Sequence, residues 1–187
     1  GDGVMAVDYK QVYRNLHDYV VLVTGLPNES VRPTYENASS QPTQDRGLLC
    51  SINIINQTEI GIDARNYNDQ QAGEDLDEDV IGDRNITASI KAYGELAADT
   101  CEKIVLGLKS AAGAEFLNTK ELGYLRHGSI LNISSIQNGG FEKRNQVDVE
   151  FHIKTSVTAE VNAIQSAVIG VAFYGSGEIT EQIEVTQ

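Results

Sequence analysis

The stretch Gln146–Lys154 reads QVDVEFHIK and alternates strictly between apolar and polar residues. The apolar positions are Val147, Val149, Phe151 and Ile153. The polar positions between them are Asp148, Glu150, His152 and Lys154. Because successive side chains of a strand point to opposite faces, this alternation predicts a strand with one buried face. We expect the strand to run over about Arg144–Val157.

A hairpin signal stands before this strand. Asn138-Gly139-Gly140 has the chemistry of a tight turn, so we expect an antiparallel partner strand over about Arg126–Ile136. The other segments with strand patterns are Leu48–Ile55, Thr58–Tyr67, Ile86–Tyr93, Val168–Tyr174 and Glu178–Val185. The chain is therefore expected to be rich in strands that arrive mainly as hairpins.

The segment Asp8–Val23 has helical periodicity instead. Its apolar side chains recur at intervals of three and four residues, which is the spacing of one helix face. Asp8 and Gln11 resemble a capping box at its start, and Gly25 followed by Pro27 is a typical stop.

A second helix is expected over about Glu95–Ala112, with a short helical turn over Glu115–Lys120. The apolar face of the second helix consists of Ala97, Cys101, Ile104, Leu108 and Ala111. Between the first helix and the first strand lies a connection of about twenty residues that contains Tyr35 and Asn37. A connection of this length is often a functional loop or an interface arm.

These elements predict an α+β fold, in which an antiparallel or mixed β-sheet is covered on one face by two helices. We expect residues 8–157 to form the domain, residues 1–7 an N-terminal extension and residues 158–187 a strand-rich C-terminal extension. The two cysteines, Cys50 and Cys101, lie in apolar patterns and are expected to be buried free thiols; a disulfide or a reactive thiol is the alternative.

The composition limits the possible partners. The chain has 27 acidic and 14 basic side chains, a formal net charge of −13. Affinity for nucleic acid or anionic lipid comes from basic side chains, so this chain is not expected to bind either tightly. No apolar run reaches the ~18 residues that cross a bilayer, and no export signal is visible.

The run Gly73–Asp83, GEDLDEDVIGD, concentrates the negative charge. Asp75, Asp77 and Asp79 fit the first three positions of a calcium loop, but Val80 replaces the required glycine and Ile86 the closing acid. We therefore favour a solvated acidic loop between two strands. The alternative is a loop, including Glu78, that must stay off an anionic surface.

Catalytic and metal-binding motifs are not evident in the sequence. His17, His127 and His152 have no second ligand at metal-binding spacing. Gly-x-Ser-x-Gly and a phosphate-binding loop are also absent, since Gly175-Ser176-Gly177 is only a flexible turn. We expect neither an enzyme nor a cofactor.

Two groups of residues carry a family resemblance. The first is Val23-Thr24-Gly25-Leu26-Pro27, followed by Val31–Asn37 (VRPTYEN) and Pro42. It resembles the "TGLP…VIRxYQN…P" opening of the neck or tail-terminator proteins of contractile-tailed bacteriophages. The second is Phe141–Asp148 (FEKRNQVD), which is similar to the family's "WExRxxxD" strand entry with Phe141 in the place of tryptophan. The resemblance covers about Asp8–Val157, whereas the acidic run and the last thirty residues lie outside its pattern.

The resemblance implies a virion structural protein, assembled in the cytoplasm of the bacterial host. Such a protein is expected to form a homohexameric ring that caps the tail tube and sheath, joins the tail to the head connector and lets DNA pass. The residues that we expect at the subunit interface are Tyr35, Asn37, Glu142, Arg144 and Asp148. The residues that we expect at the bore or its rim are Asp75, Asp77, Glu78 and Asp79.

Alternatives to this interpretation stay open at the level of the sequence. By strand parity Glu142, Arg144, Asp148 and Glu150 share one face, which is either an ordinary polar surface or a contact between subunits. The protein could also be another tail or tail-completion component, or a monomeric acidic module that binds a basic partner. A hydrolase with a concealed site is the least favoured alternative.

Overall fold

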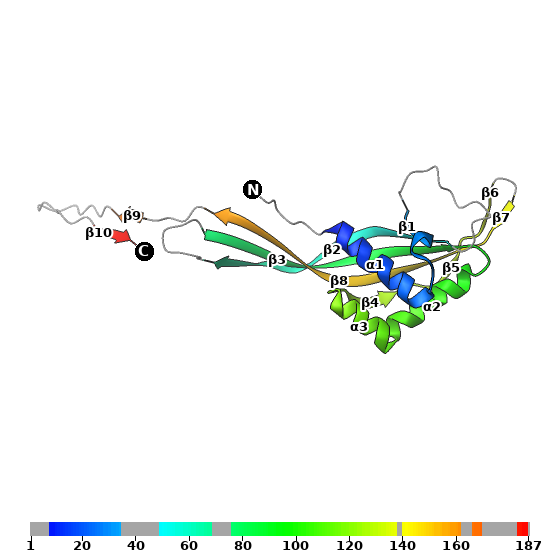
Figure 1. The fold of residues 1–187 in the computed structure, drawn as a ribbon. Helices are drawn as coiled ribbons and strands as arrows, with labels where there is room; N and C mark the ends of the chain where they lie inside the picture. Colours follow the sequence, from blue (N-terminus) through cyan, green and yellow to red (C-terminus); the bar gives the residue numbers. More distant parts are fainter. Residues whose placement is uncertain are drawn as a thin grey trace, which may run out of the picture.

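Three long strands form the spine of the molecule (Figure 1). They are β2 (Leu49–Asn68), β3 (Leu76–Tyr93) and β8 (Arg144–Val161). β3 lies in the middle and is antiparallel to both neighbours. The structure, a computed structural model, describes residues 8–34, 49–68, 76–137, 140–161, 166–169 and 183–186.

Shorter strands complete this sheet at one end. β1 (Val31–Pro33) pairs with β2 in parallel, and β4 (Gly123–His127) and β5 (Leu131–Asn132) pair with β8 in antiparallel fashion. The order is β1-β2-β3-β8-β4, with β5 also beside β8. The sheet is therefore mixed, and the predicted α+β class is confirmed.

Three helices cover one face of the sheet near its short strands (Figure 1). They are α1 (Tyr9–Thr24), α2 (Ala97–Lys109) and α3 (Ala111–Thr119), and a single 3-10 turn, η1 (Asn28–Ser30), follows α1. The predicted second helix is too long, because Ser110 adopts an extended conformation and its Oγ accepts a hydrogen bond from the Gly113 N–H. Ser110 thereby caps a new helix, and Ala111 is exposed instead of lying on the apolar face.

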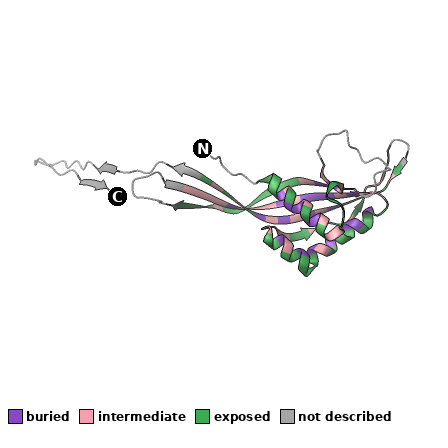
Figure 2. Cartoon of the chain, in the orientation of Figure 1, coloured by how far each residue is buried: buried purple, intermediate pink, exposed green. Residues whose placement is uncertain are grey.

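The core lies where the helices cross the sheet, and Figure 2 shows the buried residues gathered there. The predicted apolar face of β8 is buried, from Val147 to Ile153. Phe151 is opposite Ile86 of β3, and both side chains are fully buried. From the helices, Tyr19 enters the core and its hydroxyl donates to the Ile104 carbonyl at 2.8 Å.

The ends of α1 follow the sequence signals in part. The Asp8 carboxylate accepts hydrogen bonds from the N–H groups of Lys10 and Gln11, and Gly25 closes the helix with φ of 72°. The predicted capping box is incomplete, because the Gln11 side chain donates to Asn15 Oδ1 at 2.8 Å instead of returning to Asp8.

The prediction of two strands over Leu48–Tyr67 is wrong, because β2 runs through both. Its register with β3 shifts between Ile54 and Asn56 and again between Ile60 and Ala64. Gly61, with φ of 71°, lies in the second irregularity, where Gly61–Asp63 have no partner in β3. Both irregularities are bulges, and pairing with β3 resumes beyond each of them.

The prediction of an acidic loop is also wrong from Leu76 onwards. Leu76–Asp83 is the first part of β3 and pairs with β2 on one side and β8 on the other. Beyond the helices these strands continue as a three-stranded extension, which we call the ribbon: residues 55–68, 76–85 and 152–161 (Figure 1). Central-strand pairing fixes the acidic residues in extended conformation despite their mutual repulsion.

The predicted hairpin is confirmed, since β6 (Ser135–Gln137) pairs with β7 (Gly140–Glu142) in antiparallel fashion. The single strand expected over Arg126–Ile136 is instead divided among β4, β5 and β6. In the tail, β9 (Ser166–Ile169) pairs with β10 (Ile183–Thr186) and overlaps the predicted strands only in part.

Both cysteines are buried free thiols, as predicted. Burial raises the pKa of Cys50 to about 12 and that of Cys101 to about 11. Within the described residues no helix is long and apolar enough to cross a membrane.

Candidate functional site

The sheet face opposite the helices, which we call the open face, carries paired charges. The Nε and Nη2 atoms of Arg126 donate to the two carboxylate oxygens of Glu150, both at 2.8 Å. The two residues lie opposite each other in β4 and β8. This two-point geometry raises the pKa of Arg126 through the hydrogen bond from its guanidinium to Glu150.

Arg144 of β8 is engaged within its own chain. Its Nε donates to Glu142 Oε2 at 2.7 Å, and its guanidinium lies 5.2 Å from the centre of the Tyr93 ring. Asp148 does not join this pair, because its Oδ1 accepts from Gln146 Nε2 at 3.0 Å. The structure thus pairs two of the predicted interface residues, Glu142 and Arg144, whereas Asp148 is not part of this pair.

The ion pair between Arg144 and Glu142 is largely shielded from solvent, with 20% and 13% of the two side chains exposed. Because Glu142 belongs to β7 and Arg144 begins β8, the pair ties the β6–β7 hairpin to the sheet. This hairpin presents two apolar side chains, Ile136 and Phe141, which are opposite each other and 77% and 62% exposed.

The acidic candidates do not form one cluster. Glu78 Oε1 accepts from the Tyr67 hydroxyl at 2.9 Å and lies 3.6 Å from Arg65 Nη1. Asp79 Oδ1 accepts from Thr158 Oγ1 at 2.5 Å. As consecutive residues of a strand, Glu78 and Asp79 point to opposite faces of the ribbon.

The backbone of Asp77 pairs with Asn68 and Glu160 in the ribbon. Asp75, Tyr35 and Asn37 lie outside the described residues.

The histidines have different partners. His17 contacts Asp18 Oδ1 at 3.0 Å and the Asn28 carbonyl at 3.1 Å, whereas His152 Nε2 lies 3.2 Å from Asp83 Oδ1. Across the parts of the chain that the structure describes, no three His, Cys, Asp or Glu side chains are grouped as a metal site.

The outer edge of β2 is an exposed apolar surface that sequence reasoning did not identify. Beyond Ile52, where pairing with β1 ends, this edge has no strand partner among the described residues. Its exposed apolar side chains are Ile55, Ile60, Ile62 and Tyr67. Ile62 is 97% exposed, and the glycine that precedes it, Gly61, was the only signal of its position in the sequence.

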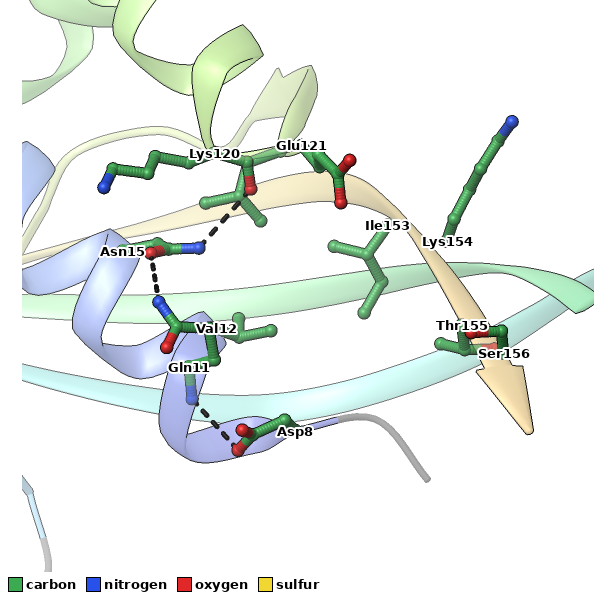
Figure 3. A pocket seen from close by; sticks show the side chains of 11 residues that line it. Asp8, Gln11, Val12, Asn15, Lys120, Glu121, Ile153, Lys154, Thr155 and Ser156 are labelled. Carbon is green, nitrogen blue, oxygen red and sulfur yellow. Dashed lines mark hydrogen bonds between the residues drawn. The ribbon is translucent and has the colours of Figure 1, made fainter. Parts of the chain in front are cut away.

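The edge of β8 is hollowed on both sides. A cavity of about 290 Å³ lies between α1, the α3–β4 connection and β8 (Figure 3). Its walls are tied together by Asn15, whose side chain donates to the Lys120 carbonyl at 3.4 Å. A second cavity of about 450 Å³ is lined by residues that include Ile81, Gly123 and His152. The two cavities share Glu121, Lys154, Thr155 and Ser156.

A comparison with protein families identifies the chain. A family model described as phage neck terminator protein matches residues 10–176. The chain belongs to this family. No curated protein sequence matches the chain at a significant level.

Membership of the phage neck terminator family confirms the resemblance drawn from the TGLP and FEKR segments. It makes the protein a structural component of the phage tail neck and not an enzyme. The family match also includes the acidic run and extends to residue 176, beyond the limit of Val157 that the sequence motifs indicated. Among the exposed apolar side chains of the described residues are Ile62 and Tyr67 on the β2 edge and Ile136 and Phe141 on the hairpin.

Proposed function

We propose that copies of this neck terminator protein form a closed, six-membered ring that caps the tail tube and sheath and joins the tail to the head connector. The family membership over residues 10–176 carries this proposal. The number six and the named neighbours follow from the resemblance to tail-terminator proteins.

In this ring the genome passes through a bore that does not bind it. The net charge of −13 per chain is multiplied by the number of copies and repels the phosphate backbone. Three arginines of the sheet are less free to bind phosphate, since Arg84, Arg126 and Arg144 each donate to a carboxylate. Asp79 and Asp83 supply negative charge along the ribbon, and Asp75, Asp77 and Glu78 remain proposed residues of the bore or its rim.

The β6–β7 hairpin is the part best suited to contact a different virion protein. Ile136 and Phe141 present a cross-strand apolar pair on a short hairpin, which is held by Arg144 and Glu142. Arg144 and Glu142 thus hold in place the hairpin that makes this contact. Tyr35 and Asn37 remain proposed contacts to a neighbouring subunit. Asp148, on the open face, is proposed to face the bore or a neighbour.

The experiment combines light scattering in solution with electron microscopy of the protein added to purified tail tubes. We expect a mass six times that of the 20.3-kDa chain, in solution or on the tail, and a ring at the tail end. An Ile136→Asp, Phe141→Asp variant is expected to keep its ring and lose attachment. A stable monomer that attaches to no tail would refute the proposed function.

A further inference from the structure

We propose that neighbouring copies in the ring join edge to edge, with Ile62 of one copy inserted into the hollow at the β8 edge of the next. This inference rests on the proposed ring and names the surfaces that close it. The occupant of each hollow is therefore a second copy of this chain.

Ile62 forms a fixed projection from the β2 edge. It lies in the bulge Gly61–Asp63 and is 97% exposed. The bulge is held in place because both carboxylate oxygens of Asp63 accept hydrogen bonds from Arg84, at 2.7 and 2.8 Å. An apolar side chain on a restrained backbone loses little conformational entropy when it is buried by a partner.

The β8 edge supplies the complementary hollow. β4 pairs with β8 only as far as Gly123, opposite His152, so the outer edge of β8 from Ile153 onwards has no strand partner within the described part of the chain. Unpaired edge strands present free backbone donors and acceptors to another strand. The two cavities of about 290 and 450 Å³ flank this edge at Lys154–Ser156.

Ile62 and the hollow at Lys154–Ser156 lie at the same position along the strands of the ribbon. Ile60 is opposite Asp83, which is opposite Lys154, and Ala64 is opposite Ile81, which is opposite Ser156. Ile62 therefore lies level with Thr155, on the other edge. Copies related by rotation about an axis along the strands can only contact through surfaces at matching heights, and these two surfaces meet that condition.

The charges at the two edges are also complementary. Glu59 on β2 is exposed, and Lys154 on β8 is exposed and points away from α1 (Figure 3). Within the described residues neither has a salt-bridge partner in its own chain. Glu59 is level with Ile153, the neighbour of Lys154, so edge-to-edge contact brings opposite charges together.

The symmetry of this contact favours a ring over a dimer. β2 and β8 are both antiparallel to β3, so they run in the same direction at opposite edges. A contact between two different edges is heterologous, and it closes into a ring when the rotation per copy divides a full turn. A pairing of β2 with β2 would instead stop at two copies.

Cysteine cross-linking tests the contact directly. Within one chain, the positions of Ile62 and Ser156 are separated by two strand spacings, about 10 Å, which is beyond the reach of a disulfide. We expect mixed Ile62→Cys and Ser156→Cys chains to cross-link as heterodimers, and the double variant to give a ladder ending in a closed ring. Cross-linking of Ile62→Cys with itself, or no cross-link in rings that do form, would overturn the inference.

Assembly variants provide a second test. Ile62→Asp is expected to raise the concentration needed for half-assembly about tenfold or more, because it places a charge in the hollow. Leu106→Asp, at a 57% exposed position of α2, is the matched control and should leave assembly unchanged. Glu59→Lys and Lys154→Glu should each weaken assembly, and the double swap should restore it.

The two proposals fail in different ways. If the unaltered protein forms rings and Ile62→Asp forms them equally well, the edge contact is refuted and the ring stands. If the unaltered protein forms no ring in solution or on tails, both proposals are refuted.

Discussion

Arg84 and Asp63 form a two-point ion pair directly over Gly82. Arg84 Nη1 and Nη2 lie 2.7 and 2.8 Å from the two carboxylate oxygens of Asp63. Asp63 belongs to the bulge of β2 and Arg84 to β3, so the pair fixes the bulge against the central strand. The hydrogen bond from Arg84 lowers the pKa of Asp63 below its usual 3.8.

The first prediction concerns the space that Gly82 leaves for this pair. A Cβ at this position would lie 2.3 Å from Asp63 Oδ1 and 2.4 Å from Arg84 Nη1. Gly82→Ala should therefore displace the pair and lower the thermal midpoint. Gly128→Ala is the control, because its Cβ would meet only the Asp148 carbonyl at 3.7 Å. Equal midpoints for the two variants would contradict the role of Gly82.

The second prediction follows from the lowered pKa of Asp63. Its carboxylate binds protons less readily in the folded chain, so the pair stabilises fully at pH values above 3.8 and loses this effect as the pH falls through the folded pKa. Asp63→Asn removes the titrating group. Urea unfolding should show a stability difference between the two proteins at neutral pH that shrinks as the pH falls below 3.8. A difference that does not change with pH would argue against the pair.

The sequence allows the covered part of the fold to be predicted. Alternation in Gln146–Lys154 and Ile86–Tyr93 follows burial because helices pack on one face of the sheet there. Apart from the N-terminal end of α1, which contacts Gln57, no described helix covers the ribbon, so burial does not enforce alternation along most of it. The acidic residues of Leu76–Asp83 therefore suggested a loop, although both neighbouring strands hold them in β3.

The candidate site was predictable only where parity between residues close in sequence was informative. Parity placed Arg144 near carboxylates, and the structure pairs it with Glu142. The pair of Arg126 and Glu150 joins residues 24 positions apart and depends on strand register, which spacing alone does not give. The exposure of Ile62 depends on a bulge, and the sequence marked that bulge only by Gly61.

The third prediction concerns the close approach of α1 and α2. At Gly107 a Cβ would lie 2.6 Å from Val23 Cγ1 and 2.8 Å from the Tyr19 hydroxyl. Gly107→Ala should destabilise the fold by about 1–3 kcal/mol through overpacking, although alanine is the better helix former. Urea unfolding measures the effect, with Lys103→Ala on the exposed side of α2 as control. A more stable Gly107→Ala variant would show that the helices separate without cost.

The fourth prediction concerns the thiols. Cys50 and Cys101 are both buried, and burial raises their pKa values to about 12 and about 11. Because the thiolate is the reactive form, neither should react with a thiol reagent in the folded protein at mildly alkaline pH. Both should react once the chain is unfolded in guanidinium. Rapid labelling of the folded protein would place a cysteine at an accessible site.

The last prediction tests whether the acidic segment of the ribbon keeps DNA from binding. Replacing Asp75, Asp77 and Asp79 by lysine changes the formal charge from −13 to −7, since each substitution adds two units. We expect the assembled variant to bind duplex DNA in an anisotropy titration, with an affinity that falls steeply as salt rises.

The control variant has the same net charge, but its lysines replace Asp99, Glu102 and Glu115 on the exposed outer side of α2 and α3. Only the ribbon variant should bind if this segment lines the bore, because the control charges lie on the helices that cover the other face. Equal binding by both would show that net charge alone keeps the protein from DNA, and no binding by either would place the segment on the outer wall of the ring.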